Sequence, residues 1–106
     1  MLNFLKSLFG SGPKVNYSDV VSRGALIMDV RTKSEYQDGH IKSSVNIPLN
    51  HLKDELSKLN KDKPIITCCA SGSRSSVAKR ILKSAGFSEV HNGGAWQSLQ
   101  YKIRKG

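Results

Sequence analysis

A chain of 106 residues is long enough for one domain with a modest core and too short for two. Apolar residues make up 38% of the sequence, which argues against a disordered chain. The formal net charge of +9 suits anionic partners. The lysines are scattered without interleaved aromatic residues, so we do not expect a nucleic-acid-binding protein.

The first nine residues, Met-Leu-Asn-Phe-Leu-Lys-Ser-Leu-Phe, form an apolar segment with helical spacing. Lys6 interrupts this segment, which is too short to cross a bilayer and lacks the order of a secretory signal. Two interpretations stay open: a terminal segment that frays or docks on the core, and an anchor that contacts a membrane surface weakly. Residues 10–13, Gly-Ser-Gly-Pro, indicate a hinge, so we divide the chain into a segment of residues 1–13 and a domain of residues 14–106.

Short apolar runs alternate with polar helical stretches beyond the hinge. This alternation is typical of an α/β fold, in which helices cover both faces of a mostly parallel sheet. We expect five strands, at residues 14–16, 25–29, 44–46, 64–68 and 89–91.

Polar residues mark the starts of the helices between these strands. Ser18 is placed to cap a helix that runs to about residue 22, and Asn50 to cap a helix that runs to residue 59. Thr32 and Glu35 have the spacing of a capping box. The longest helix is predicted from residue 74 or 75 to residue 85, before Gly86. Its apolar face, which we expect to pack on the sheet, comprises Val77, Ile81, Leu82 and Ala85.

A cysteine followed by small residues stands between the fourth predicted strand and the longest helix. The loop after Cys69 comprises Ala70, Ser71, Gly72, Ser73, Arg74 and Ser75. Small residues allow consecutive backbone N–H groups to point at the sulfur, Arg74 adds positive charge, and the helix adds its N-terminal dipole. Gly72 supplies the positive φ that such a tight turn needs. These features predict a lowered pKa for the thiol and a nucleophilic Cys69.

The neighbouring Cys68 receives a different interpretation. Adjacent cysteines cannot stabilise a fold through a disulfide, because a disulfide between them has poor geometry and closes almost no loop. We therefore expect a reducing compartment and a cytoplasmic location. Side chains alternate along a strand, so Cys68 faces into packing if Cys69 faces the loop. An alternative role for Cys68 is to resolve an oxidised or persulfidated Cys69.

The other polar residues near the loop are interpreted mainly as structural. Arg74 has two roles that can hold together: its guanidinium orients a bound anion, and it stabilises the loop through carbonyl groups or a carboxylate. A structural ion-pair network is the interpretation for Asp29, Arg31 and Glu35. His40 and His91 lack ligand spacing with each other or with the cysteines, so we expect no metal site.

The loop Cys69-x-Ser-Gly-x-Arg-Ser resembles the active-site loop of the rhodanese-type sulfurtransferases. The rest of that family's pattern lies around the loop in the same order, over about residues 15 to 101. The matching segments are Met28-Asp29-Val30-Arg31, Glu35-Tyr36, Gly39-His40-Ile41, Asn46-Ile47-Pro48, Ala85-Gly86-Phe87, Val90 and Gly93-Gly94-Ala95-Trp96.

This resemblance implies a rhodanese-like three-layer fold and transfer of a sulfane sulfur by double displacement. Cys69 would take the sulfur from thiosulfate or another anionic persulfide donor, and its persulfide would pass it to cyanide, a thiol or a protein acceptor. The loop from Ala70 to Ser75 would bind the substrate. We expect a monomer that needs no cofactor.

Two alternatives to a sulfurtransferase stay open. A persulfide carrier or sensor with low turnover needs the same Cys69, so the sequence does not separate it from an efficient enzyme. A cysteine-dependent phosphatase or arsenate reductase uses a related loop. The resemblance counts against this second alternative, because residues 69–74 span six positions and the related dual-specificity phosphatase loop is one residue longer.

Overall fold

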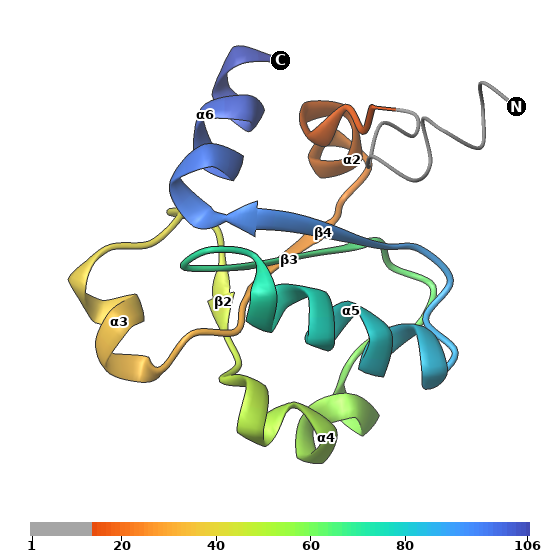
Figure 1. Cartoon of the computed structure of the whole chain (residues 1–106). Coiled ribbons are helices and arrows are strands. Elements are labelled where there is room, and N and C mark those ends of the chain that lie inside the picture. Colours follow the sequence, from red (N-terminus) through yellow and green to blue (C-terminus); the bar gives the residue numbers. More distant parts are fainter. Residues whose placement is uncertain (1–13) are drawn as a thin grey trace, which may run out of the picture.

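The computed structural model describes residues 14–106, and Figure 1 shows how their elements are arranged. The expectations for residues 1–13 lie outside the described residues. The helices are α2 (Tyr17–Ser22), α3 (Lys33–Asp38), α4 (Leu52–Glu55), α5 (Ser73–Ser84) and α6 (Trp96–Lys105). The strands are β1 (Leu26–Asp29), β2 (Val45–Asn46), β3 (Ile65–Cys69) and β4 (Val90–Ala95). Two short 3-10 turns, η1 (Leu49–His51) and η2 (Leu56–Lys58), flank α4.

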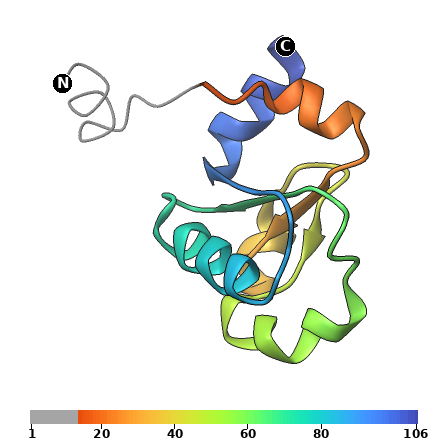
Figure 2. The same cartoon turned by 90° about the vertical axis from the view of Figure 1, so that its right-hand side faces the viewer.

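These strands form one parallel sheet in the order β2-β1-β3-β4. Strand β3 has a neighbour on each side and is buried at every residue, which explains its continuous apolar run in the sequence. Helices α2 and α6 cover one face of the sheet and α4 and α5 cover the other, as Figures 1 and 2 show. The expected α/β fold with three layers is therefore confirmed.

Each face of the sheet carries its own apolar cluster. The cluster on the α4 and α5 face comprises Met28, Val30, Leu52, Ile65, Cys69, Ala78, Leu82, Phe87 and Val90. The cluster on the α2 and α6 face comprises Val20, Ile27, Ile41, Ile66, Cys68 and Leu99. Neighbouring residues of β3 fall into different clusters because successive side chains of a strand point to opposite faces.

The prediction of a fifth strand at residues 14–16 is wrong, because the structure has four strands within residues 14–106. Asn16 instead caps α2: its side chain accepts the N–H of Asp19 at 3.0 Å, while its backbone is extended, with φ −88° and ψ 92°. An N-cap residue has this extended conformation, which explains why the sequence of the segment resembles that of a strand. Ser18, the predicted cap, lies inside the helix.

The other predicted helix boundaries have mixed outcomes. The capping box of Thr32 and Glu35 at the start of α3 is confirmed, with both reciprocal hydrogen bonds present. The cap predicted at Asn50 is wrong, since helical backbone begins at Leu49 directly after Pro48 and lacks a side-chain cap. The proline presets the φ that a helix start accepts, here −53°. The single helix expected over residues 50–59 is divided into η1, α4 and η2.

Helix α5 lies close to its predicted position, and the loop after Cys69 leads into its N-terminus. It begins at Ser73, after Gly72 with φ +105°, and is followed by Gly86 with φ +95°. Its buried residues are Ser75, Ala78 and Leu82. Of the predicted apolar face, Ile81 and Ala85 pack at the edge of the core, and Val77 lines a surface hollow. The packing face is thus turned slightly from the predicted one.

Candidate active site

Cys69 is the last residue of β3, and its side chain lies on the α4 and α5 face of the sheet. It has 0% exposed surface, so its sulfur forms the floor of the loop that follows. Cys68 also has 0% exposed surface but belongs to the cluster on the opposite face. The structure therefore separates the two thiols by the alternation that the sequence predicts.

The Cys69 sulfur is surrounded by hydrogen-bond donors. The backbone N–H groups of Gly72 and Ser75 donate to Sγ at 3.0 and 3.4 Å, and the Ser75 hydroxyl oxygen lies 3.4 Å from Sγ. Burial of the thiol raises its pKa, but hydrogen bonds from the Ser75 hydroxyl and from the N–H groups of Ser75, Gly72 and Ser71 outweigh it. The pKa of Cys69 is consequently lowered from its ordinary value.

Cys68 has the opposite electrostatic surroundings. Burial raises the pKa of its thiol to about 12, and the nearby Asp29 carboxylate adds to this rise. A thiol with such a pKa stays protonated at neutral pH and is a poor nucleophile. Its surroundings give Cys68 a packing role.

A second ring of contacts holds the Cys69 loop in shape. The Thr67 hydroxyl donates to the Ser75 carbonyl at 2.8 Å and so links β3 to the first turn of α5. A Cβ built on Gly93 would lie 2.8 to 2.9 Å from side chains of Leu99 and Ile66 and from the Thr67 carbonyl. Only glycine therefore allows β4 to lie this close to β3 and α6. Gly93 has a packing role.

Asn92, the third of the six residues of β4, is a site residue that the sequence does not predict. Its side-chain oxygen accepts hydrogen bonds from the Ser75 hydroxyl at 2.6 Å and from the Gly94 N–H at 2.9 Å. Its amide nitrogen donates to the Gly72 carbonyl at 3.3 Å. The single hydroxyl proton of Ser75 thus has Asn92 as its nearest acceptor, so Asn92 orients the group that contacts the Cys69 sulfur. The only signal in the sequence is a polar residue directly after the strand predicted at residues 89–91, because sites of parallel sheets gather at the carboxyl ends of strands.

Arg74 makes a bidentate ion pair with a residue of α3. Its two terminal nitrogens lie 2.7 and 3.0 Å from the carboxylate oxygens of Glu35. Glu35 also accepts hydrogen bonds from the N–H and hydroxyl of Thr32, both at 3.1 Å. These partners, Arg74 first, hold the pKa of Glu35 at about 2. The geometry supports the loop-stabilising role of Arg74 and joins the loop to α3.

The ion-pair network expected around β1 is confirmed for two of its three members. Arg31 donates to both carboxylate oxygens of Asp29, at 2.7 to 3.1 Å, and both side chains are buried. Arg31 also donates to the Gly39 carbonyl at 2.6 Å and lies over the Trp96 ring at 5.0 Å. It contacts Glu35 only at the backbone carbonyl, so the Glu35 side chain serves the loop and not this pair.

The histidines have structural partners as well. The His40 ring stacks on Tyr36 with centroids 3.7 Å apart, and its Nδ1 lies 2.6 Å from the Tyr36 carbonyl. His91 Nε2 lies 2.8 Å from a Glu89 carboxylate oxygen. Within residues 14–106, no three His, Cys, Asp or Glu side chains gather as a metal site would require. No helix in this part of the chain has the length and apolar character needed to cross a membrane.

Comparisons with known proteins all indicate the same family. A family model described as "Rhodanese-like domain" matches residues 15–97. The thiosulfate sulfurtransferase PspE of Escherichia coli is 32% identical over 81 residues, which cover 74% of this chain and 78% of PspE. The thiosulfate sulfurtransferase GlpE of Pseudomonas savastanoi is 34% identical over 70 residues, which cover 66% of each chain.

Solved structures give the same indication. A rhodanese with anions from Escherichia coli superposes with a TM-score of 0.67 at 30% identity, and the match covers 71% of this chain and 91% of that one. Some matched proteins are longer than the aligned region. The chain spans 56% and 36% of the length of two further curated relatives, both from Bacillus subtilis.

Proposed function

Because the chain belongs to the rhodanese-like domain family, we propose that it transfers a sulfane sulfur through a persulfide on Cys69. The observation that carries the proposal is the contrast between two adjacent thiols. Of the two, only Cys69 has converging hydrogen bonds that lower its pKa, whereas the pKa of Cys68 is raised to about 12. The thiosulfate sulfurtransferases among the relatives suggest thiosulfate as one donor.

The first step is attack by the Cys69 thiolate on the outer sulfur of an anionic donor such as thiosulfate. A new S–S bond forms, the S–S bond of thiosulfate breaks, and sulfite leaves with that electron pair. The products are sulfite and a Cys69 persulfide. No proton moves in this step, and accordingly the loop of residues 70–75 needs no histidine or carboxylate.

The second step returns the enzyme to its starting state. A nucleophilic acceptor, cyanide or a thiolate, attacks the outer sulfur of the persulfide. The S–S bond of the persulfide breaks and its electron pair returns to Cys69 as the thiolate. The N–H groups of Gly72 and Ser75, which donate to Sγ, stabilise the negative sulfur before and after each step.

The pairing of Arg74 with Glu35 bears on the choice of donor. The guanidinium charge beside the loop is partly offset by the carboxylate 2.7 Å away, so the backbone N–H groups supply most of the attraction for an anion. A loop with so little net positive charge attracts a dianion such as thiosulfate weakly. We therefore include persulfides of small thiols and of proteins among the donors.

An intact-mass experiment tests the proposal. The purified protein is incubated with thiosulfate, with a low-molecular-weight persulfide or with an aryl phosphate, and excess reagent is removed before measurement. We expect one added sulfur from at least one sulfur donor, its removal by cyanide as thiocyanate, and no phosphate release. An aryl phosphate turned over faster than both sulfur donors would identify a phosphatase and overturn the proposal.

A further inference from the structure

A surface groove lies between α5 and the segment formed by α4 and η2. Figures 1 and 2 both show α4 and α5 side by side on the same face of the sheet. The groove has a volume of about 520 Å³. Its apolar lining comes from Leu56, Val77, Ile81 and Ala85, and its polar lining from Lys53, Arg80 and Ser84.

The N-terminus of α5, beyond this groove, follows the Cys69 loop. A smaller hollow of about 280 Å³ lies beside the first turn of α5, where Val30, Leu49 and Arg74 contribute to its lining. Helix α5 rises about 1.5 Å per residue, so Val77 stands about 5 Å and Ala85 about 17 Å along the helix from Arg74. A molecule that lies along α5 over both hollows would therefore reach the Cys69 loop with one of its ends.

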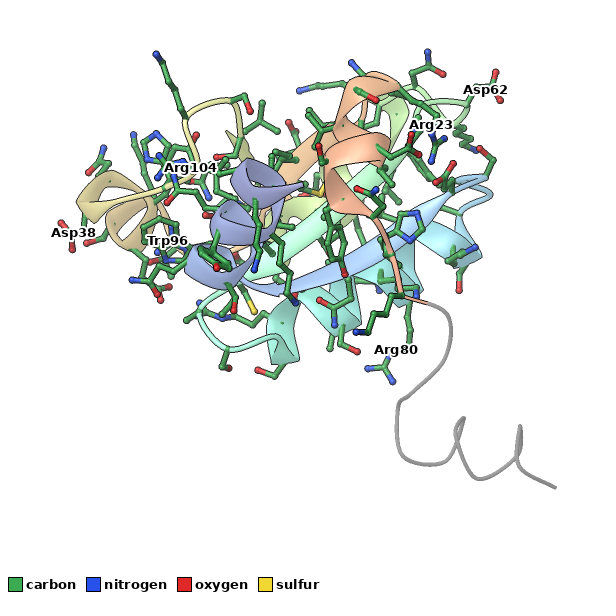
Figure 3. The ribbon with its side chains drawn as sticks, turned by 90° about the horizontal axis from the view of Figure 1, so that it is seen from above. Arg23, Asp38, Asp62, Arg80, Trp96 and Arg104 are labelled. Atoms are coloured by element: carbon green, nitrogen blue, oxygen red, sulfur yellow. The ribbon has the colours of Figure 1, made fainter. Side chains whose placement is uncertain are left out.

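Two cations at the groove lack acidic partners. Among residues 14–106, neither Lys53 nor Arg80 takes part in an ion pair, in contrast to Arg74, which is paired with Glu35. Figure 3 shows the Arg80 side chain extending away from the ribbon of α5. The net charge of +9 adds a long-range attraction for acidic molecules.

We propose that this groove is the docking site for an acidic protein segment that places apolar side chains between α4 and α5 and carboxylates on Lys53 and Arg80. The proposal rests on the proposed sulfur transfer, because the docked protein would be the one that gives sulfur to Cys69 or takes it. A segment that follows α5 brings its own thiol to the mouth of the loop. Apolar anchors surrounded by complementary charge are the usual composition of such interfaces.

The probe for this proposal is a synthetic amphipathic peptide of about 15 residues, with leucines at helical spacing, flanking glutamates and a C-terminal cysteine. Its control replaces the glutamates with lysines. The groove variant is Lys53→Glu/Arg80→Glu. The matched control variant is Lys42→Glu/Arg104→Glu, which changes the net charge equally at exposed residues outside the groove. Figure 3 shows Arg104 on α6, away from Arg80.

Peptide binding is measured by fluorescence anisotropy on the full chain carrying Cys69→Ser, with or without each pair of substitutions, so that no sulfur chemistry is involved. We expect the acidic peptide to bind, the lysine peptide not to bind, and the groove variant to bind the acidic peptide at least about tenfold more weakly than the control variant. Equal binding of both peptides, equal loss in both variants, or absence of binding would overturn the docking proposal.

Sulfur transfer is then measured from the Cys69 persulfide, with Cys69 intact, to the peptide thiol and to cyanide. We expect the groove variant to slow transfer to the acidic peptide at least about tenfold and to leave transfer to cyanide unchanged. Unchanged transfer to the acidic peptide would overturn the docking proposal. Failure of the proposed function appears separately, as a protein that acquires no sulfur and gives none to cyanide.

Discussion

Cys68 and Cys69 are neighbours in one strand, yet the two faces of the sheet give them different chemistry. On the α2 and α6 face, burial and the Asp29 carboxylate keep the Cys68 thiol protonated. On the α4 and α5 face, burial also opposes ionisation, but donors from Ser75, Gly72 and Ser71 outweigh it. The comparison shows that burial alone does not decide whether a thiol reacts: the supply of hydrogen bonds to the sulfur does.

Exchanging each sulfur for oxygen gives the largest predicted difference between the two faces. Cys69→Ser should lower sulfur transfer by about 10⁴-fold or more, because no thiolate remains to attack the donor. Cys68→Ser should retain most of the activity and lose about 1 kcal/mol of stability, since a hydroxyl without an assured partner replaces a buried thiol. Steady-state rates and urea unfolding of both variants measure this. Loss of activity in Cys68→Ser with wild-type rates in Cys69→Ser would contradict the assignment.

The second prediction changes the backbone that supplies the donors. Gly72→Ala forces a Cβ onto a residue with φ +105°, which costs about 1 to 2 kcal/mol unless the turn moves. Movement of the turn would displace the N–H that lies 3.0 Å from the Cys69 sulfur. We expect the rate of sulfur transfer to fall about 10²-fold, as for loss of an oxyanion-hole donor. The surroundings of Cys68, on the other face of the sheet, should not change.

Gly24→Ala serves as the control for this substitution, because Gly24 also has positive φ, at +91°, but lies outside the site. It should cost similar stability and little activity. An equal loss of activity in both variants would show that destabilisation, and not the position of the N–H group, explains the result.

The third prediction concerns the pair that joins the loop to α3. Arg74→Ala and Glu35→Gln should each lower transfer about tenfold, because either one removes the bidentate contact. Arg74→Lys keeps the charge but not the planar fork, so we expect it to resemble Arg74→Ala. Rate measurements with thiosulfate compare the three variants. Wild-type activity in Arg74→Lys would show that the charge acts directly on the donor.

The stability that the pair of Arg74 and Glu35 contributes should fall as the pH is lowered. The pKa of Glu35 is lowered to about 2 from 4.5, so its contribution to stability is present above pH 4.5 and is lost as the pH falls toward 2. The Glu35→Gln protein should therefore lose less stability than the wild-type protein as the pH falls from 4.5 toward 2. Acid unfolding followed by circular dichroism checks the difference between the two proteins.

The fourth prediction is smaller and tests the orientation of the Ser75 hydroxyl. Asn92→Asp keeps an acceptor for that hydroxyl but adds negative charge near the Cys69 sulfur. The pKa of Cys69 should rise, and transfer at pH 7 should slow about three- to tenfold, with recovery as the pH is raised. A pH–rate profile that falls equally at every pH would assign Asn92 a merely structural role.

How well the sequence predicts a contact in this site depends on how far apart its two residues lie in the sequence. The alternation of Cys68 and Cys69, the positive φ of Gly72 and the capping box of Thr32 follow from local geometry, and the structure has all three. The partner of Arg74 lies 39 residues away in the sequence, so no local pattern identifies Glu35 among the available carboxylates.

Asn92 is not predicted as a site residue for a different reason. It keeps regular register with Thr67 and follows the buried Val90 by two residues, so alternation places its side chain on the α5 face beside Ser75. The strand predicted from the sequence ends at residue 91, which leaves Asn92 in the loop after it. Thr67 pairs with Asn92 but Cys69 pairs with Ala95, so the one extra residue of β4 lies after Asn92. The missing strand at residues 14–16 has a simpler cause, because the extended backbone of the Asn16 cap looks like strand from the sequence.

The central claim is that the two faces of β3 set the ionisation of the two thiols, and thiolate absorbance in the ultraviolet measures this directly. Cys68→Ser and Cys69→Ser proteins are titrated against pH, with the Cys68→Ser/Cys69→Ser double variant as the blank for tyrosine. We predict that Cys69, the thiol left in Cys68→Ser, ionises below the ordinary thiol pKa of about 8.5. Cys68, the thiol left in Cys69→Ser, should stay protonated until far higher pH, near its raised pKa of about 12 or where the fold is lost. A Cys69 thiol that ionises at or above the ordinary value, or a Cys68 thiol that ionises first, would contradict the account.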